Sequence, residues 1–188
     1  MFRVIAIGGE PATGKTTLMF ELIKKATDWE IVKPEKLLDA MYSKSLNTYI
    51  LGKYANDGNV FQGTDRLSMA VQPDAEKFFA SQFDKSVNVI FEGDRLFNGK
   101  TINMLSDKLP ESQFKVLVLE ATHGTKEKRH HDRKDDQDDK FKNSRATKIA
   151  NICSSLTLMD YITIMTNENL DDQKKIIGFI NDFLQWSE

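Results

Sequence analysis

Residues 9–16 have the residue types and the spacing of a loop that holds phosphate groups. They read G-x-x-x-x-G-K-T, and Thr17 follows them. Glycines let backbone N–H groups curl around phosphate oxygens, and a helix N-terminus adds partial positive charge. Lys15 can then reach terminal phosphates, and the Thr16 hydroxyl can bind Mg²⁺. The pattern predicts contacts to a nucleoside triphosphate from Gly9, Glu10, Pro11, Ala12, Thr13, Gly14, Lys15, Thr16 and Thr17.

The segments on either side of this loop are the ones that such a loop requires. Residues 4–8 form an apolar run suited to a buried parallel strand, and residues 17–25 have helical periodicity. Strand, glycine-rich turn and helix therefore follow one another in the required order. A chance match in an ordinary turn needs neither flanking element, so we interpret the loop as a triphosphate site.

Further apolar runs alternate with helical patterns along the chain. Extended segments are expected at residues 30–34, 37–42, 48–54, 87–91, 114–119 and 161–165, and helices at 65–83, with an interruption at Pro73, and at 171–186. This alternation predicts a three-layer α/β fold with a mainly parallel central sheet, helices on both faces and a basic lid. The active site is expected at the carboxyl ends of the strands.

Length and composition indicate one soluble globular domain, residues 1–188. The net charge of -2 argues against nucleic-acid binding by the surface as a whole, but it leaves room for a local basic groove. A single cysteine, Cys153, excludes an internal disulfide and is interpreted as a small buried residue. No apolar run approaches a membrane span, and the early first strand leaves no room for a signal peptide. We therefore expect a cytoplasmic protein.

Two acidic–basic pairs follow predicted strands and are candidates for chemistry. Glu92 closes the strand at 87–91, where it could contact Mg²⁺ through water or orient an acceptor, and Asp94 and Arg95 follow where a substrate would be held. Asp65 is a candidate general base for an acceptor hydroxyl, and Arg66 for bidentate phosphate binding. The alternative is structural, with Asp94 and Arg95 as a surface pair at a helix start and Thr64 or Asp65 as a helix cap.

The polar segment at residues 123–148 has too few apolar residues for a core helix. It is interpreted either as a solvated helical excursion or as a mobile lid. Arg129 and Arg133 are spaced i and i+4, so on a helix they share a face and could clamp the γ-phosphate. Arg145 and Lys148 could act similarly at the stem of the lid. The alternative is a charged solvated helix, balanced by Asp132, Asp135, Asp136, Asp138 and Asp139.

With these features the chain resembles the P-loop nucleotide kinases, the group that includes thymidylate kinase. The resemblance rests on residues 9–16, on the segment from Glu92 to Arg95, and on Arg129 and Arg133. It implies a P-loop NTPase fold and an ATP-dependent kinase. It also implies catalytic roles for Lys15, Asp65, Glu92, Asp94, Arg129 and Arg133, and a magnesium site formed by Thr16 and Glu92.

Residues 49–54 and 63–70 make the chain similar to a narrower group, the phage kinases that act on 5-hydroxymethyluracil in DNA. That similarity implies that the acceptor is a base hydroxymethyl group, phosphorylated for thymidine hypermodification, and that the protein works in the host cytoplasm. The DNA would need a local basic groove, to which Lys53, Arg66, Arg95, Lys100 and the lid cations would contribute.

Two alternatives to a DNA kinase remain open at the level of sequence. A kinase of free nucleosides or nucleoside monophosphates would use Arg66 or Arg95 to grip the acceptor phosphate. A nucleotide-dependent switch would need a guanine-specifying Asn-Lys-x-Asp element, but Thr166, Asn167, Glu168 and Asn169 occupy the region after the last strand. The absence of this element argues against a nucleotide-dependent switch, and it favours ATP over GTP as the bound nucleotide. The sequence does not indicate an oligomeric state.

Overall fold

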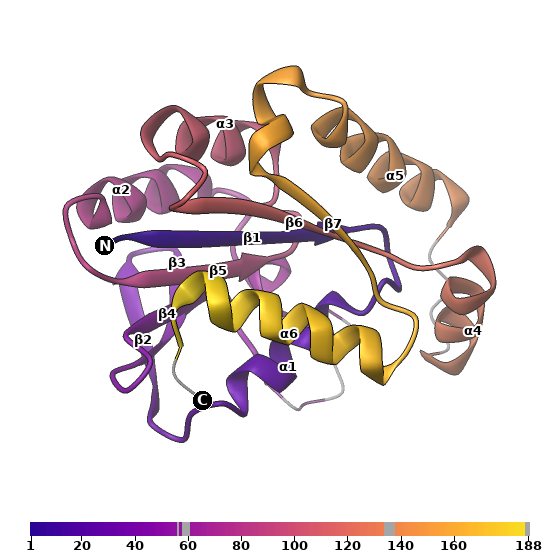
Figure 1. The fold of residues 1–188 in the computed structure, drawn as a ribbon, viewed down its shortest axis with the longest axis horizontal. Coiled ribbons are helices and arrows are strands. Elements are labelled where there is room, and N and C mark those ends of the chain that lie inside the picture. The colour runs from indigo at the N-terminus through magenta and orange to yellow at the C-terminus, as the bar shows by residue number, and fades with distance from the viewer. Residues whose placement is uncertain (56, 58–60, 134–137, 187–188) are drawn as a thin grey trace.

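The computed structural model describes residues 1–55, 57, 61–133 and 138–186, and a twisted seven-stranded sheet lies at its centre (Figure 1). The strands are arranged in the order β2-β3-β4-β5-β1-β6-β7. Their bounds are β1 Arg3–Gly9, β2 Trp29–Glu35, β3 Leu38–Ser43, β4 Thr48–Leu51, β5 Asn88–Glu92, β6 Phe114–Glu120 and β7 Ile162–Thr166.

The sheet is mostly parallel, as the sequence predicted. Strand β1 pairs in parallel with β5 and β6, while β4 and β7 extend the parallel part on either side. Strands β2, β3 and β4 form an antiparallel extension at one edge. The carboxyl ends of β1 and β5 therefore lie side by side, which brings the loop at residues 9–16 next to Glu92.

Helices cover both faces of the sheet (Figure 1). The side chains of β1 alternate, with Val4 and Ala6 in one core and Ile5 and Ile7 in the other. The first core includes residues of α2, α3 and α5, and the second includes residues of α1 and α6. The helices are α1 Lys15–Ile23, α2 Gln72–Gln82, α3 Gly99–Lys108, α4 His123–Arg133, α5 Asp139–Cys153 and α6 Leu170–Leu184.

The extended segments predicted at residues 37–42 and 48–54 are confirmed and form an antiparallel hairpin, but the second strand is shorter than expected. Strand β4 ends at Leu51 because Gly52 leaves the strand with φ +107°. A Cβ on Gly52 would lie 2.1 Å from the backbone carbon of Gly63, so the two backbones pack directly together. Lys53 and Gly63 then exchange two backbone hydrogen bonds of 2.9 and 2.8 Å.

The helix predicted from residue 65 begins later, so that part of the prediction was wrong. Residues Thr64–Arg66 form a short 3₁₀ turn, Leu67 is extended, and α2 begins at Gln72. Pro73 lies in the first turn of α2, where the absent N–H has no helical partner to lose. Pro73 therefore starts the helix and does not interrupt it.

The polar segment at 123–148 contains α4 and the first two thirds of α5, so its described part is largely helical. The far end of α5 joins the core through Ile149, Ile152 and the partly buried Cys153. The side chain of Arg133 and the acidic residues Asp135 and Asp136 lie outside the described part of the chain. Within the described part, no helix has the length and apolar character needed to cross a membrane.

Candidate active site

The loop at residues 9–16, predicted to bind phosphates, joins β1 to α1 and is shaped by three residues with positive φ. These are Gly9 at +138°, Ala12 at +62° and Gly14 at +90°. A Cβ on Gly9 would lie 2.4 Å from the Leu119 carbonyl oxygen, so only glycine fits against the end of β6. Ala12 adopts a conformation that costs a non-glycine residue about 1–2 kcal/mol, and such strain is concentrated at functional sites.

The ammonium group of Lys15 lies against the backbone of this loop. Its Nζ donates to the carbonyl oxygens of Gly9 and Glu10, both at 2.9 Å. The Thr13 hydroxyl also donates to the Glu10 carbonyl, at 2.9 Å. Because α1 begins at Lys15, the first amides of that helix have no intrahelical acceptor. The loop thus presents an ammonium group and a helix N-terminus to one pocket.

Three carboxyl groups meet in that pocket, as the sequence predicted for Glu92 and Asp94 at the end of β5. Asp65 joins them from the 3₁₀ turn, and its Oδ1 accepts a 2.6 Å hydrogen bond from the Asp94 N–H. Glu92 Oε1 accepts from the Thr16 hydroxyl at 3.3 Å. All three carboxyl residues line the pocket together with Lys15 and Thr16.

Burial sets the electrostatics of this acidic group. Burial raises the pKa of Glu92 from 4.5 to about 7, an effect that the positive charge of Lys15 opposes and the negative charge of Asp65 reinforces. Burial also raises the pKa of Asp65, and the neighbouring charge of Asp94 raises it further. The pocket therefore concentrates negative charge that a cation or a proton can neutralise.

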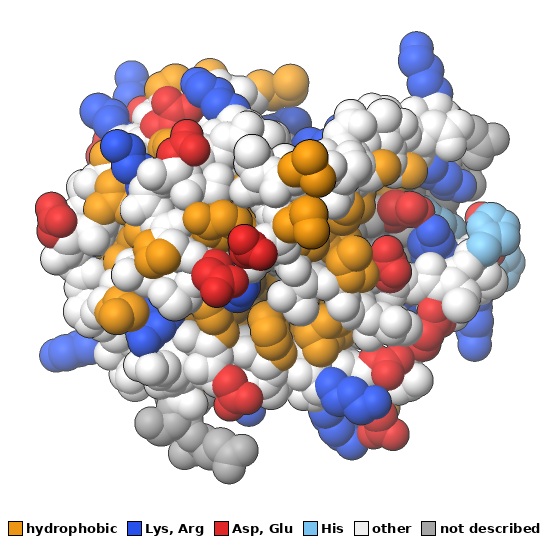
Figure 2. All heavy atoms as spheres, turned by 45° about the horizontal axis from the view of Figure 1, so that its top comes forward, with side chains coloured by type: hydrophobic (Ala, Val, Ile, Leu, Met, Phe, Trp, Pro, Cys, Tyr) orange, Lys and Arg blue, Asp and Glu red, His pale blue; other side chains and the backbone are white. Residues whose placement is uncertain are grey.

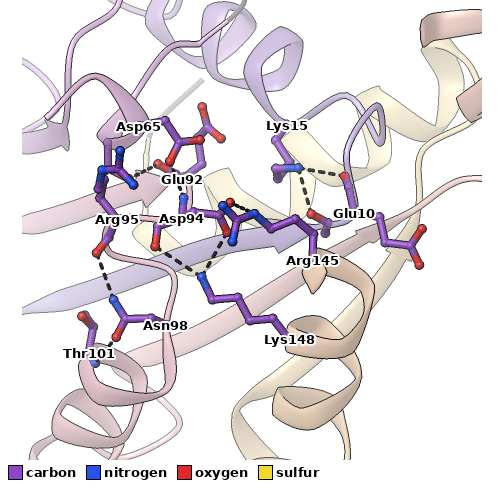
Figure 3. A network of polar contacts seen from close by, with 12 residues as sticks. Glu10, Lys15, Asp65, Glu92, Asp94, Arg95, Asn98, Thr101, Arg145 and Lys148 are labelled. Atoms are coloured by element: carbon purple, nitrogen blue, oxygen red, sulfur yellow. Dashed lines mark hydrogen bonds and ion pairs between the residues drawn. The ribbon is translucent and has the colours of Figure 1, made fainter. Parts of the chain in front are cut away.

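Helix α5 supplies the opposite wall of the pocket. Arg145 forms an ion pair with Asp94, and the Lys148 Nζ lies 3.0 Å from Asp94 Oδ1 (Figure 3). The guanidinium carbon of Arg145 lies 4.5 Å from the centre of the Phe141 ring. Phe141 and Phe61 also line the pocket. The sequence named Arg145 and Lys148 as cations at the stem of the predicted lid; in the structure Arg145 lines the pocket and both cations contact Asp94.

Arg129 lies elsewhere, against the loop backbone. Its guanidinium donates to the carbonyl oxygens of Ala12 at 3.0 Å and Asn167 at 2.8 Å. Asn167, in turn, donates from Nδ2 to the Thr13 carbonyl at 2.8 Å. These contacts fasten α4 and the end of β7 to the loop. Sequence reasoning missed Asn167, and its position directly after an apolar strand was the available signal.

A second, separate depression lies beside the start of α1. Arg129 and Asn167 belong to its lining and not to that of the pocket around Lys15. The other residues that line it are Gly14, Thr17, Glu168, Asn169, Leu170 and Gln173. The segment from Gly9 to Thr17 therefore borders one pocket at Lys15 and another at Thr17.

The residues predicted to bind substrate lie outside the described lining of the Lys15 pocket. Lys53 pairs with Asp39 at 3.3 Å, and Arg66 pairs with Asp57 at 2.8 Å. Arg95 Nε is buried without a hydrogen-bond partner among the described residues. Acidic and basic side chains are interspersed over the face shown in Figure 2. The substrate roles of Lys53, Arg66 and Arg95 stay predictions.

The described residues contain no group of three or more His, Cys, Asp or Glu side chains arranged to hold a metal. Mg²⁺ does not require such a cage, because it keeps several waters and uses one or two side chains together with substrate phosphates. The Thr16 hydroxyl and the Glu92 carboxylate, 3.3 Å apart beside Lys15, fit that need.

No model of a known protein family matches the chain, and a search of curated proteins found no match.

Proposed function

We propose that this protein is an ATP- and Mg²⁺-dependent phosphotransferase with a P-loop NTPase fold. The observation that carries the proposal is the meeting of the loop residues Lys15 and Thr16 with Asp65, Glu92 and Asp94 in one pocket. Phosphoryl transfer needs charge neutralisation, a metal and an aligned acceptor, and these side chains match those needs. The central position of β1 beside β5 and β6 supports the fold assignment.

The residues divide the work between the two pockets of the loop. In the Lys15 pocket, the ammonium group and the loop amides hold the terminal phosphates. Thr16 and Glu92 would hold Mg²⁺, which would neutralise the charge that develops on the transferring phosphate. The depression at Thr17 and Arg129 receives the nucleoside, because Gly14 and Thr17 in its lining directly flank Lys15 and Thr16. ATP remains the proposed donor.

Asp65 is the proposed general base for a hydroxyl acceptor. The pKa of Asp65 is raised toward neutral pH, and a general base is most effective when its pKa lies near the working pH. Arg145 and Lys148 hold Asp94 while the pocket is closed by α5, which limits the access of water to the transferring group. A closed α5 therefore favours transfer over hydrolysis.

We propose 5-hydroxymethyluracil in phage DNA as the acceptor, with the hydroxymethyl oxygen as the nucleophile. Phe61 and Phe141 offer aromatic surfaces on which a base can stack. A groove next to the pocket, lined by Asn103, Thr147 and Lys148 between α3 and α5, offers space for the rest of a strand. A monophosphate acceptor is favoured less, because Arg66 and Arg95 do not line the pocket.

A kinase of free nucleosides or nucleoside monophosphates remains the second candidate. Arg145 and Lys148 favour it, because two cations at the pocket could grip an acceptor phosphate once released from Asp94. A slowly hydrolysing switch is the third candidate, and it uses the loop but needs no acceptor.

Transfer of labelled γ-phosphate from ATP separates these candidates. The acceptors tested in parallel are DNA containing 5-hydroxymethyluracil, ordinary DNA of the same sequence, and a panel of free nucleosides and monophosphates. We expect label only on the hydroxymethylated DNA. Label on a free nucleotide would establish the second candidate, and hydrolysis without a labelled acceptor would favour the switch. Absence of both transfer and hydrolysis in the presence of Mg²⁺ would refute the phosphotransferase proposal.

A further inference from the structure

Arg145 is held in the Lys15 pocket by contacts on two of its sides. Its guanidinium carbon lies over the Phe141 ring, 4.5 Å from the ring centre, so one face of the guanidinium group is covered by an aromatic ring. Its Nε edge forms the ion pair with Asp94 (Figure 3). Phe141 and Arg145 are four residues apart on α5, a spacing that places them on the same face of the helix. The orientation of the guanidinium plane is therefore fixed before a ligand binds.

Asp94, which holds this edge, is itself fixed by its neighbours. Its other carboxylate oxygen lies 3.0 Å from Lys148 Nζ, and its backbone N–H donates to Asp65 Oδ1 at 2.6 Å. Asp65 and Arg145 line the same pocket. A ligand that contacts Arg145 in this pocket therefore lies near the proposed general base.

The part of Arg145 that faces the pocket is the part that Phe141 and Asp94 leave uncovered. The side chain is 27% exposed and belongs to the lining of the pocket. Because Phe141 covers one face and Asp94 covers the Nε edge, a ligand meets the second face or the outer N–H groups. The second face suits a planar ring, whereas the outer N–H groups suit a phosphate.

The surroundings of Arg145 favour the planar ring. The apolar side chains that line the same pocket include Phe61, Phe97 and Ile149. A phosphate would compete with the Asp94 carboxylate, which already pairs with both Arg145 and Lys148. A neutral base that stacks on the uncovered face leaves both ion pairs in place.

We infer that Arg145 is a specificity-determining residue of the acceptor site, and that the uncovered face of its guanidinium group stacks on the base that carries the acceptor hydroxyl. This inference rests on the proposed function. The bound base completes a stack of base, guanidinium group and Phe141 ring, in which the positive charge attracts the aromatic ring on each side. Asp94 is a positioning residue in this arrangement, because it holds the plane and does not contact the base.

The test measures calorimetrically how much one base adds to binding, in the presence of Mg²⁺ and a non-hydrolysable ATP analogue. The first pair of ligands is a short DNA strand of abasic residues with and without one central 5-hydroxymethyluracil. The second pair is the free 5-hydroxymethyldeoxyuridine monophosphate and deoxyribose phosphate. We expect the base to raise the affinity of the DNA strand by about tenfold or more.

Two variants should reduce this gain. Arg145→Lys keeps the charge but loses the plane, and we expect the gain to fall by about fivefold or more. Phe141→Leu removes the ring beneath the guanidinium group and should change the gain in the same direction. Lys142→Ala is the control, because it removes a charge from α5 outside the lining of the pocket and should leave the gain unchanged. Thermal unfolding checks that each variant is folded.

Each outcome has a distinct meaning. A gain in the second pair alone supports the stacking and assigns the base to a free nucleotide. An unchanged gain in folded Arg145→Lys overturns the inference, and so does an equal loss of affinity for ligands with and without the base, which would mean that Arg145 grips a phosphate. Label transfer to hydroxymethylated DNA without a base-dependent gain would overturn the inference and leave the proposed function standing. A base-dependent gain without transfer to any acceptor would refute the phosphotransferase and leave the base-binding site.

Discussion

Replacing Glu92 with glutamine should make the protein more stable at alkaline pH and should weaken the proposed magnesium site. Burial raises the pKa of Glu92 from 4.5 to about 7, so folding favours its protonated form. The corresponding stability is fully present below pH 4.5 and is lost as the pH rises through 7. The difference between the two pKa values corresponds to roughly 3 kcal/mol. Glutamine carries no charge at any of these pH values and escapes the loss.

The measurement is urea unfolding of the unsubstituted protein and of Glu92→Gln at several pH values from 5.0 to 8.5, without Mg²⁺. The quantity to follow is the free energy of unfolding of the variant minus that of the unsubstituted protein. Groups that titrate alike in both proteins cancel in this difference. We expect it to rise by about 2–3 kcal/mol across the range, with most of the rise between pH 5 and 7.5.

Glu21→Gln is the matched control, because Glu21 lies on α1 in a surface pair with Lys24. Its difference from the unsubstituted protein should be flat across the same pH range. If the difference in free energy of unfolding for Glu92→Gln also stays constant with pH, the claim that burial raises the pKa of Glu92 is refuted. A difference that falls with pH would mean that the folded protein stabilises the ionised carboxylate.

Three further substitutions test the remaining assignments. Lys15→Ala should reduce phosphoryl transfer at least about a hundredfold while the circular dichroism spectrum stays unchanged, and near-normal turnover would remove the central assignment. Asp65→Asn should lower turnover by about 10²–10⁴-fold with little change in nucleotide affinity, whereas an unchanged rate would leave Asp65 a structural role. Arg129→Ala should cost about 1.5–3 kcal/mol in urea unfolding, because the guanidinium joins the loop to the segment after β7. The exposed neighbour Lys128→Ala should stay within about 0.5 kcal/mol, and equal losses for both would contradict the bracing role of Arg129.

The parts of the site that could be predicted from sequence are those that depend on residue spacing and on the order of neighbouring strands and helices. The loop at 9–16 could be predicted from the spacing of its own residues and from the strand and helix patterns that flank it. Glu92 could be placed beside it because parallel strands end at one edge of a sheet, and β5 proved to be the neighbour of β1. The alternation of strands and helices likewise predicted the α/β class and the mostly parallel sheet.

The parts that sequence did not predict depend on contacts between distant segments. Helical spacing places Arg129 on a face of α4, but it cannot tell whether that face meets the pocket or the back of the loop. Asp65 reaches the pocket because Gly52 and Gly63 pack backbone to backbone, a contact that periodicity does not reveal.

The position of Lys15 has a consequence for which anions the loop will accept. The Lys15 ammonium group donates hydrogen bonds to the carbonyl oxygens of Gly9 and Glu10, so the loop itself supplies acceptors for this cation. A ligand that recruits the ammonium group must first replace bonds that are worth about 1.5–3 kcal/mol each. A ligand that also contacts the helix amides and Thr16 forms further bonds that offset this loss. The resting contacts of Lys15 therefore lower the affinity of the loop most for an anion that reaches this side chain alone.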